Sequence, residues 1–207
     1  MLAVPRSTGN WRLTAPGSQL PAPFSLYPVP MATLRPATFD PASNDPALCR
    51  TLMREYARFL NDSVGHQHIC VDSLEEELAA LPGAYAEPAG AVLLAFDNET
   101  PAGCVALKPL HLPQPADPNE KACEMKRLWV RPTHQGSGLG RRLSQAIIEA
   151  ARQRAYTAMY LDTMPASMQA AYRLYLSMGF APVPRYTVNP VLRQSDSLAI
   201  AFLRKEL

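Results

Sequence analysis

The sequence of 207 residues lacks the features that mark several large classes of protein. No apolar run approaches the roughly 20 residues that a membrane-spanning helix requires, so we expect a soluble protein with no membrane partner. The formal net charge is only +2 and 18% of the residues are charged, so no strong basic field points to nucleic acid. No internal repeat is visible. The near balance of positive and negative charges favours a small-molecule partner.

Paired cysteines and clustered metal ligands are also missing. The four cysteines are Cys49, Cys70, Cys104 and Cys123. They are widely spaced, form no CxxC pair and accompany no export signal, so we expect reduced, mostly buried thiols in a cytoplasmic protein. His66 and His68 alternate in an extended segment, but two ligands without a third are too few for a metal ion. The sequence therefore predicts no metal site.

Proline is plentiful at the start of the chain. Residues 1–30 hold six prolines, with glycine and serine between them and no hydrophobic periodicity. This composition predicts a flexible or polyproline-like arm. Few basic residues and no continuous apolar core make a signal peptide unlikely on composition. At 47% hydrophobic content, we expect one folded domain over residues 31–207.

Hydrophobic periodicity predicts alternating strands and helices over this domain. We expect strands at residues 32–38, 91–96, 103–107, 122–130, 159–163, 180–188 and 197–204. We expect helices at residues 45–60, 73–81, 139–152 and 168–178. The three consecutive glutamates from Glu75 to Glu77 lie largely outside the apolar stripe of their helix, which indicates a solvated face.

A glycine-rich turn between a strand and a helix carries the best clue to function. Gly136, Ser137, Gly138 and Gly140 place unpaired backbone N–H groups at a helix N-terminus, where an anion binds favourably. The dinucleotide pattern GxGxxG fails because its sixth position is Arg141, and the nucleotide ending GK[ST] is absent. We interpret the turn as a pyrophosphate cradle. The alternative is a tight strand-to-helix connection with no ligand.

Three linked motifs narrow the choice of ligand. Gln135, Gly138 and Gly140 fit QxxGxG, the preceding strand carries Glu124, and Leu174–Phe180 reads LYLSMGF, which fits LYxxxGF. Together these motifs resemble the acyl-coenzyme A site of the GNAT superfamily of N-acetyltransferases, and the similarity spans roughly residues 33–207. The resemblance implies an α/β fold with a mixed, mostly antiparallel central sheet flanked by helices.

The resemblance also implies a reaction. Acetyl-CoA would be the acyl donor, and its acetyl group would pass to a primary amine of a small molecule or protein by direct attack in a ternary complex. A non-catalytic acyl-CoA-binding sensor or interaction module, with the proline-rich arm contacting a partner, is the alternative. Oligomeric state stays open, with a homodimer as one option.

By resemblance, two neighbouring segments bind the cofactor. The backbone of the strand would pair with the pantetheine amides, and the N–H groups of the turn would bind the pyrophosphate. The residues concerned are Leu128, Trp129, Val130, Gln135, Gly136, Ser137, Gly138, Leu139, Gly140 and Arg141. The family's NxxAxxLY asparagine is replaced by Met168, so no cofactor hydrogen bond is implied from that point.

Two residues carry the chemistry by the same resemblance. Tyr175 stands where the family's general acid often sits, and Glu124 is the candidate general base. A protonated amine must lose a proton before it attacks, and a thiolate with a pKa of about 8.5 needs only a weak acid such as a phenol. Tyr172, on the same helical face, is a rival acid. Glu124 has an alternative role as an ion-pair partner of Lys126 or Arg127.

The sequence gives the least information about the acceptor site. We expect the first two helices, the loop at residues 110–121 and the segment at residues 184–196 to shape it, because these parts carry no family motif.

Overall fold

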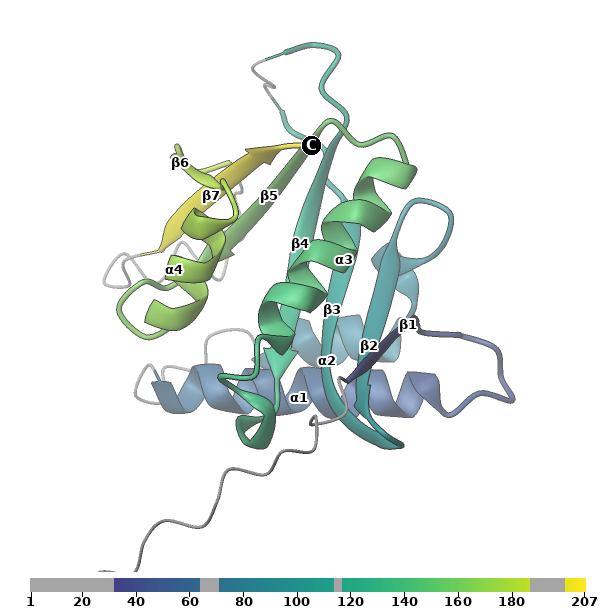
Figure 1. The fold of residues 1–207 in the computed structure, drawn as a ribbon. Coiled ribbons are helices and arrows are strands. Elements are labelled where there is room, and N and C mark those ends of the chain that lie inside the picture. Colours follow the sequence, from purple (N-terminus) through teal and green to yellow (C-terminus); the bar gives the residue numbers. More distant parts are fainter. Residues whose placement is uncertain (1–31, 64–70, 114–116, 187–199) are drawn as a thin grey trace, which may run out of the picture.

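A mixed sheet of seven strands forms the centre of the part of the chain that the structure describes (Figure 1). The strand order is β1-β2-β3-β4-β5-β7-β6. The strands are β1 Thr33–Pro36, β2 Ala91–Asp97, β3 Thr100–Pro109, β4 Ala122–Val130, β5 Ala158–Thr163, β6 Ala181–Val183 and β7 Ala201–Glu206. Only β4 and β5, among these strands, pair in parallel. The predicted fold class, a mixed and mostly antiparallel sheet with flanking helices, is confirmed.

This computed structural model describes residues 32–63, 71–113, 117–186 and 200–207, with the side chains of 71–73 left out. The predicted arm at residues 1–30 lies outside these ranges, as do His66, His68 and Cys70. Parts of the predicted acceptor loops, at 114–116 and 187–196, also lie outside them, as do residues 197–199 at the start of the last predicted strand.

Helices cover both faces of the sheet (Figure 1). Helices α1 Asp45–Ser63 and α2 Val71–Ala79 pack on one face, which we call the α1/α2 face. Helices α3 Leu139–Gln153 and α4 Gln169–Ser177 lie on the opposite α3/α4 face. Short 3-10 helices follow α2 and β4, at η1 Gly83–Tyr85 and η2 Pro132–His134. None of the described helices is long and apolar enough to cross a membrane.

The periodicity of the sequence explains most of these elements. In α3, Leu139, Leu143, Ile147 and Ala151 recur at helical spacing and are all buried against the sheet. Strand β4 has the predicted bounds, and three cysteines, at positions 49, 104 and 123, are free and buried as expected.

The observed bounds of several predicted strands differ from the prediction. Strand β6 begins after Phe180 and stops at Val183, before Pro184, whereas the prediction covered residues 180–188. Strand β1 is shorter than residues 32–38, and the Asp45 carboxylate binds the Thr38 N–H at 2.8 Å, which ties the end of this segment to α1.

Candidate functional site

The glycine-rich turn presents backbone donors at the N-terminus of α3. Gly136 has φ 78° and Gly138, at the N-cap, has φ 83°, so both use the left-handed conformation that glycine favours. In the described part of the chain, no N–H of residues 136–141 donates to a backbone carbonyl, and the first helical bond runs from the Arg142 N–H to the Gly138 oxygen. A Cβ on either glycine would meet no atom within 4 Å. The turn therefore offers several donors facing open space, which fits a pyrophosphate.

Side-chain hydrogen bonds hold this turn in place. The Gln135 amide donates to the Val130 carbonyl at 3.0 Å, and the Ser137 hydroxyl donates to the His134 carbonyl at 2.6 Å. The Arg141 guanidinium donates to the Ser177 hydroxyl of α4 at 2.7 Å. These contacts fix the shape of the turn and leave its backbone N–H groups available to an anion.

A pocket of about 400 Å³ starts at the turn and runs between β4 and α4. Its walls include eight of the predicted cofactor-binding residues, and the N-terminal part of α4 closes the other side. The lining is Phe59, Leu128, Trp129, Val130, His134, Gln135, Gly136, Gly138, Gly140, Arg141, Ser167, Met168, Gln169, Ala170, Ala171 and Leu174. Ser137 and Leu139 do not line it, and Leu139 is instead buried in the core. The pocket thus joins the glycine turn to the strand that was predicted to hold the cofactor arm.

A β-bulge in β4 sets which side chains reach this pocket. Cys104 of β3 pairs with Trp129, but Ala106 pairs with Lys126, so the single residue between them on β3 opposes two residues on β4. Arg127, one of these two, has φ 57°. Before the bulge, Met125 faces α3; after it, the alternation shifts and Trp129 packs with α1 on the opposite face.

Beyond the bulge, Leu128 and Val130 face α3 and the pocket, whereas a regular strand would turn them to the α1/α2 face. The Trp129 indole N–H donates to Glu55 of α1 at 3.1 Å. The three residues predicted to hold the thioester arm thus divide between the two faces of the sheet.

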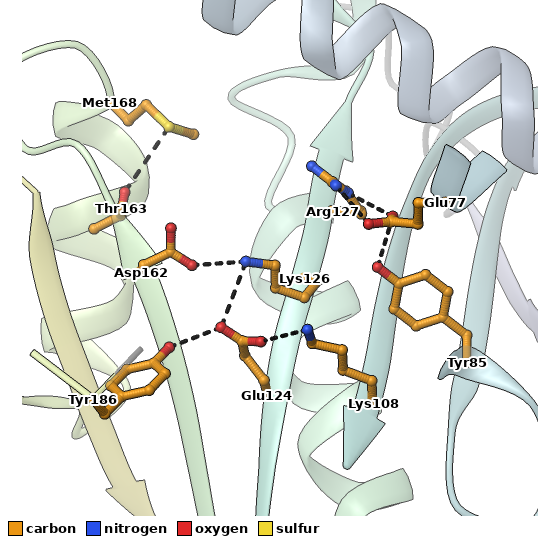
Figure 2. Close-up of polar contacts among 10 residues, drawn as sticks. All are labelled: Glu77, Tyr85, Lys108, Glu124, Lys126, Arg127, Asp162, Thr163, Met168 and Tyr186. Atoms are coloured by element: carbon orange, nitrogen blue, oxygen red, sulfur yellow. Dashed lines mark hydrogen bonds and ion pairs between the residues drawn. The ribbon is translucent and has the colours of Figure 1, made fainter. Parts of the chain in front are cut away.

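Strands β4 and β5 separate close to the bulge. Their pairing ends at Glu124 and Tyr160, and beyond it the Lys126 ammonium reaches across to the Asp162 carboxylate at 2.9 Å (Figure 2). Burial lowers the pKa of Lys126, but Asp162 and Glu124 outweigh it and leave that pKa raised. Burial likewise raises the pKa of Asp162, and the Lys126 charge more than reverses this, so the carboxylate stays ionised at neutral pH.

Glu124, the predicted general base, is buried within the same polar network (Figure 2). Its carboxylate binds the Lys108 ammonium at 3.1 Å and the Lys126 ammonium at 3.5 Å, and it accepts a hydrogen bond from the Tyr186 hydroxyl at 2.9 Å. The ion pair with Lys126 that the sequence allowed is therefore present. Arg127, the other suggested partner, binds Glu77 instead.

Tyr175, the predicted general acid, lies beside the pocket and not on its lining. Its ring is buried in the core of the α3/α4 face and packs edge-on against Phe180, with ring centroids 5.9 Å apart. Burial raises the pKa of its phenol, and the charges of Tyr56 and Asp162 raise it further. Tyr172 is partly buried and packs against the same core.

Two acidic residues near this site were not singled out from the sequence. Asp162 ends β5 and carried no motif, and its significance depends on Lys126 from a strand far away in sequence. Glu77 was placed on a solvated face, which is wrong, because its carboxylate is paired with the buried Arg127 side chain. Met168, in contrast, lines the pocket at the position where the family asparagine was expected, and its sulfur lies 3.9 Å from the Thr163 hydroxyl.

Comparisons with known proteins agree with this geometry. The family described as "Acetyltransferase (GNAT) family" matches residues 48–180. An uncharacterized N-acetyltransferase of Schizosaccharomyces pombe is 35% identical over 143 residues, which cover 69% of this chain and 80% of that protein. An uncharacterized N-acetyltransferase of Dictyostelium discoideum is 26% identical, and the match covers 76% of this chain and 93% of that protein.

Solved structures show the same fold. The PaiA N-acetyltransferase of Thermoplasma acidophilum in complex with coenzyme A superposes with a TM-score of 0.61 at 14% identity, over 85% of this chain and 99% of that chain. A GNAT family acetyltransferase of Elizabethkingia anophelis with acetyl-CoA bound gives 0.54 at 19% identity, over 86% and 99%. The enzyme class predicted from the sequence is confirmed by the family match and the named relatives. The chain belongs to the acetyltransferase (GNAT) family.

Proposed function

We propose that this chain moves the acetyl group of acetyl-CoA to a primary amine of a small molecule or protein, by direct attack within a ternary complex. The observation that carries the proposal is the row of backbone N–H groups at residues 136–141, which opens onto the pocket between β4 and α4. The two structural neighbours with bound coenzyme A and acetyl-CoA support the choice of donor.

The cofactor would lie along the pocket with its pyrophosphate at the turn. The helix dipole of α3 and the unpaired N–H groups would stabilise the phosphate charge, while the backbone of Leu128 to Val130 would pair with the pantetheine arm. A backbone N–H near the bulge would polarise the thioester carbonyl. The acetyl group would then lie near the gap between β4 and β5.

The reaction needs one base and one acid. In the proposed order of steps, the ammonium group of the acceptor first loses a proton to Glu124, directly or through water. The free amine then attacks the thioester carbon. The carbon–sulfur bond breaks, the electron pair leaves with sulfur, and Tyr175 donates its proton to the thiolate, while the proton that the new amide nitrogen loses returns to the Tyr175 oxygen. The raised pKa of Tyr175 keeps this phenol protonated at neutral pH, as its role as an acid requires.

Binding at the turn is tested by calorimetry with acetyl-CoA on the wild type, Gly138→Asp and Gly138→Asn. Both side chains are nearly the same size and both tolerate the left-handed conformation, so they differ mainly in charge. A carboxylate beside a pyrophosphate should weaken binding by about tenfold or more relative to the asparagine variant. Equal affinities in all three proteins, or no binding by the wild type, would contradict the proposed site.

Catalysis is tested separately, by the release of coenzyme A thiol from acetyl-CoA in the presence of a panel of primary amines. The expected result is amine-dependent release above the rate of hydrolysis. Tight acetyl-CoA binding without amine-dependent release would instead support the non-catalytic sensor module.

A further inference from the structure

The bulge in β4 holds a residue in an unfavourable backbone conformation. Arg127 has φ 57°, and a residue with a side chain seldom adopts this region without help from its surroundings. The register shift between Cys104 and Ala106 leaves an extra residue without a cross-strand partner. Something other than the strand pairing must therefore hold the bulge in place.

The Arg127 side chain supplies a tether to helix α2. Its Nε and Nη2 atoms donate to the two carboxylate oxygens of Glu77, at 2.9 Å and 2.7 Å (Figure 2). The Tyr85 hydroxyl donates to the same carboxylate at 2.8 Å, and Tyr85 is itself only 2% exposed. A bidentate pair of this kind fixes the orientation of the Arg127 guanidinium as well as its distance from the Glu77 carboxylate.

The tether is buried and charged. The Arg127 side chain is 10% exposed and that of Glu77 is 27% exposed. Burial raises the pKa of Glu77, but the hydrogen bonds and charge of Arg127 outweigh this effect and leave the pKa below its usual range. The pair therefore remains ionised at neutral pH. Removing either partner would leave a poorly solvated charge, so the two residues hold each other firmly.

The bulge determines which β4 side chains face α3 and the cofactor pocket. Cys123 and Met125 face α3, so in a regular strand the side chains of residues 127 and 129 would continue that face. The bulge shifts the alternation by one residue, so the side chains of Leu128 and Val130 face α3, whereas those of Arg127 and Trp129 turn to the α1/α2 face, from which Trp129 reaches the edge of the pocket. Loss of the bulge would exchange these two sets.

We infer that Glu77, oriented by Tyr85, is a positioning residue for catalysis: through Arg127 it holds the β4 bulge that directs Leu128 and Val130 toward the bound thioester. This inference rests on the proposed function. The cradle at residues 136–141 belongs to a different element and makes no contact with Glu77. The tether should therefore affect turnover more than coenzyme affinity.

The deciding comparison is between Arg127→Ala and Arg127→Gly. Both variants remove the tether, but glycine adopts positive φ without strain, so it should keep the bulge where alanine abandons it. We expect Arg127→Ala to lower kcat by about tenfold or more. Arg127→Gly should be faster than Arg127→Ala by about threefold or more and should keep the Kd for coenzyme A within about threefold of the wild type, whereas Arg127→Ala should also weaken coenzyme A binding because side chains along the pocket change faces.

A matched control comes from the same helix. Glu75 of α2 forms an equally short two-pronged pair, but with Arg54 of α1, and the pair is exposed and does not touch β4. Glu77→Gln should lower kcat without changing the Kd for coenzyme A, whereas Glu75→Gln should change neither. If thermal unfolding shows that the Arg127 variants do not fold, the comparison of Glu77→Gln with Glu75→Gln tests the inference by itself.

A double variant separates backbone positioning from simple packing. In an Arg127→Gly background, Glu77→Gln should cause no further loss of kcat, because the residue through which it acts is gone. If Arg127→Gly is no faster than Arg127→Ala, or if Glu77→Gln and Glu75→Gln behave alike, the inference is overturned. A wild type that neither binds acetyl-CoA nor releases thiol would instead refute the proposed function itself.

Discussion

The Tyr175 phenol is buried in the core of the α3/α4 face. Its ring packs against Phe180, and burial raises the pKa of the hydroxyl. A buried phenol with a raised pKa is a weak acid that stays protonated at neutral pH. Proton transfer from it to a thiolate with a pKa of about 8.5 is uphill, so the proposed acid role requires the hydroxyl to lie against the sulfur.

Replacing Tyr175 by Phe removes only the hydroxyl and keeps the ring contact with Phe180. We expect kcat to fall by about tenfold to a hundredfold, because the thiolate loses its proton donor, while the Kd for acetyl-CoA stays nearly unchanged. Steady-state kinetics and calorimetry measure the two quantities. Tyr172→Phe is the matched control; a larger loss of kcat in that variant would transfer the acid role to Tyr172.

The divergence of β4 from β5 brings two carboxylates to one face of the sheet. Glu124 comes from β4 and Asp162 from the end of β5, and Lys126 binds both (Figure 2). Glu124 is 3% exposed as a residue and has three polar partners, whereas the Asp162 side chain is 25% exposed. A proton leaving the acceptor amine would reach Glu124 most easily through a water molecule.

Parallel replacement of these two carboxylates identifies the general base. We expect Glu124→Gln to lower kcat by about a hundredfold or more, and Asp162→Asn to lower it by less than about tenfold, because only the base accepts the proton. The opposite ranking would assign the base to Asp162, with Glu124 as an ion-pair partner of Lys126 and Lys108.

Ion pairs to carboxylates tie the layers of the molecule together around β4. Arg127 binds Glu77 of α2, Arg131 binds Glu55 of α1, and Lys126 binds Asp162 of β5. A fourth pair, Arg35 with Asp45, connects β1 to α1. These contacts link the helices that border the expected acceptor site to the strand that lines the cofactor pocket.

Acidic pH should lower the free energy of unfolding of the folded domain over a defined pH range. The pKa values of Asp45, Glu55, Glu77 and Asp162 are lowered in the folded state by their cationic partners, although burial opposes the shift in each. A lowered folded-state pKa stabilises the protein above the unfolded pKa of about 4, and this stabilisation disappears as pH falls through the folded value. Unfolding free energy should therefore be level from pH 7 to about 5 and drop steeply below about 4.

Denaturant unfolding at a series of pH values measures this dependence. Glu55→Gln should reduce the slope below about pH 4, since one carboxylate with a lowered pKa is removed. Stability that began to fall near pH 6, or that stayed constant down to pH 3, would disagree with the shifts of these four groups.

Local patterns in the sequence determined the elements, the glycine turn and the family. The helical stripe of α3, the bounds of β4 and the donor-rich turn at residues 136–141 all depend on residues close together in the chain, where periodicity and glycine chemistry are readable directly. The LYxxxGF motif lies on and just after α4, where Leu174 lines the pocket and Tyr175 is buried beside it.

Only the tertiary structure decided how the two sides of the site are connected. Glu77 lies 50 residues from Arg127, and Asp162 lies 36 residues from Lys126, so neither pair leaves a periodic or spacing signal in the sequence. The bulge is equally hidden, because it depends on the register between β3 and β4 and reverses the faces of Leu128 and Trp129. Register and long-range ion pairing are properties of the packed chain, which is why the pocket beside the glycine turn and the tether between β4 and α2 appear only in the tertiary structure.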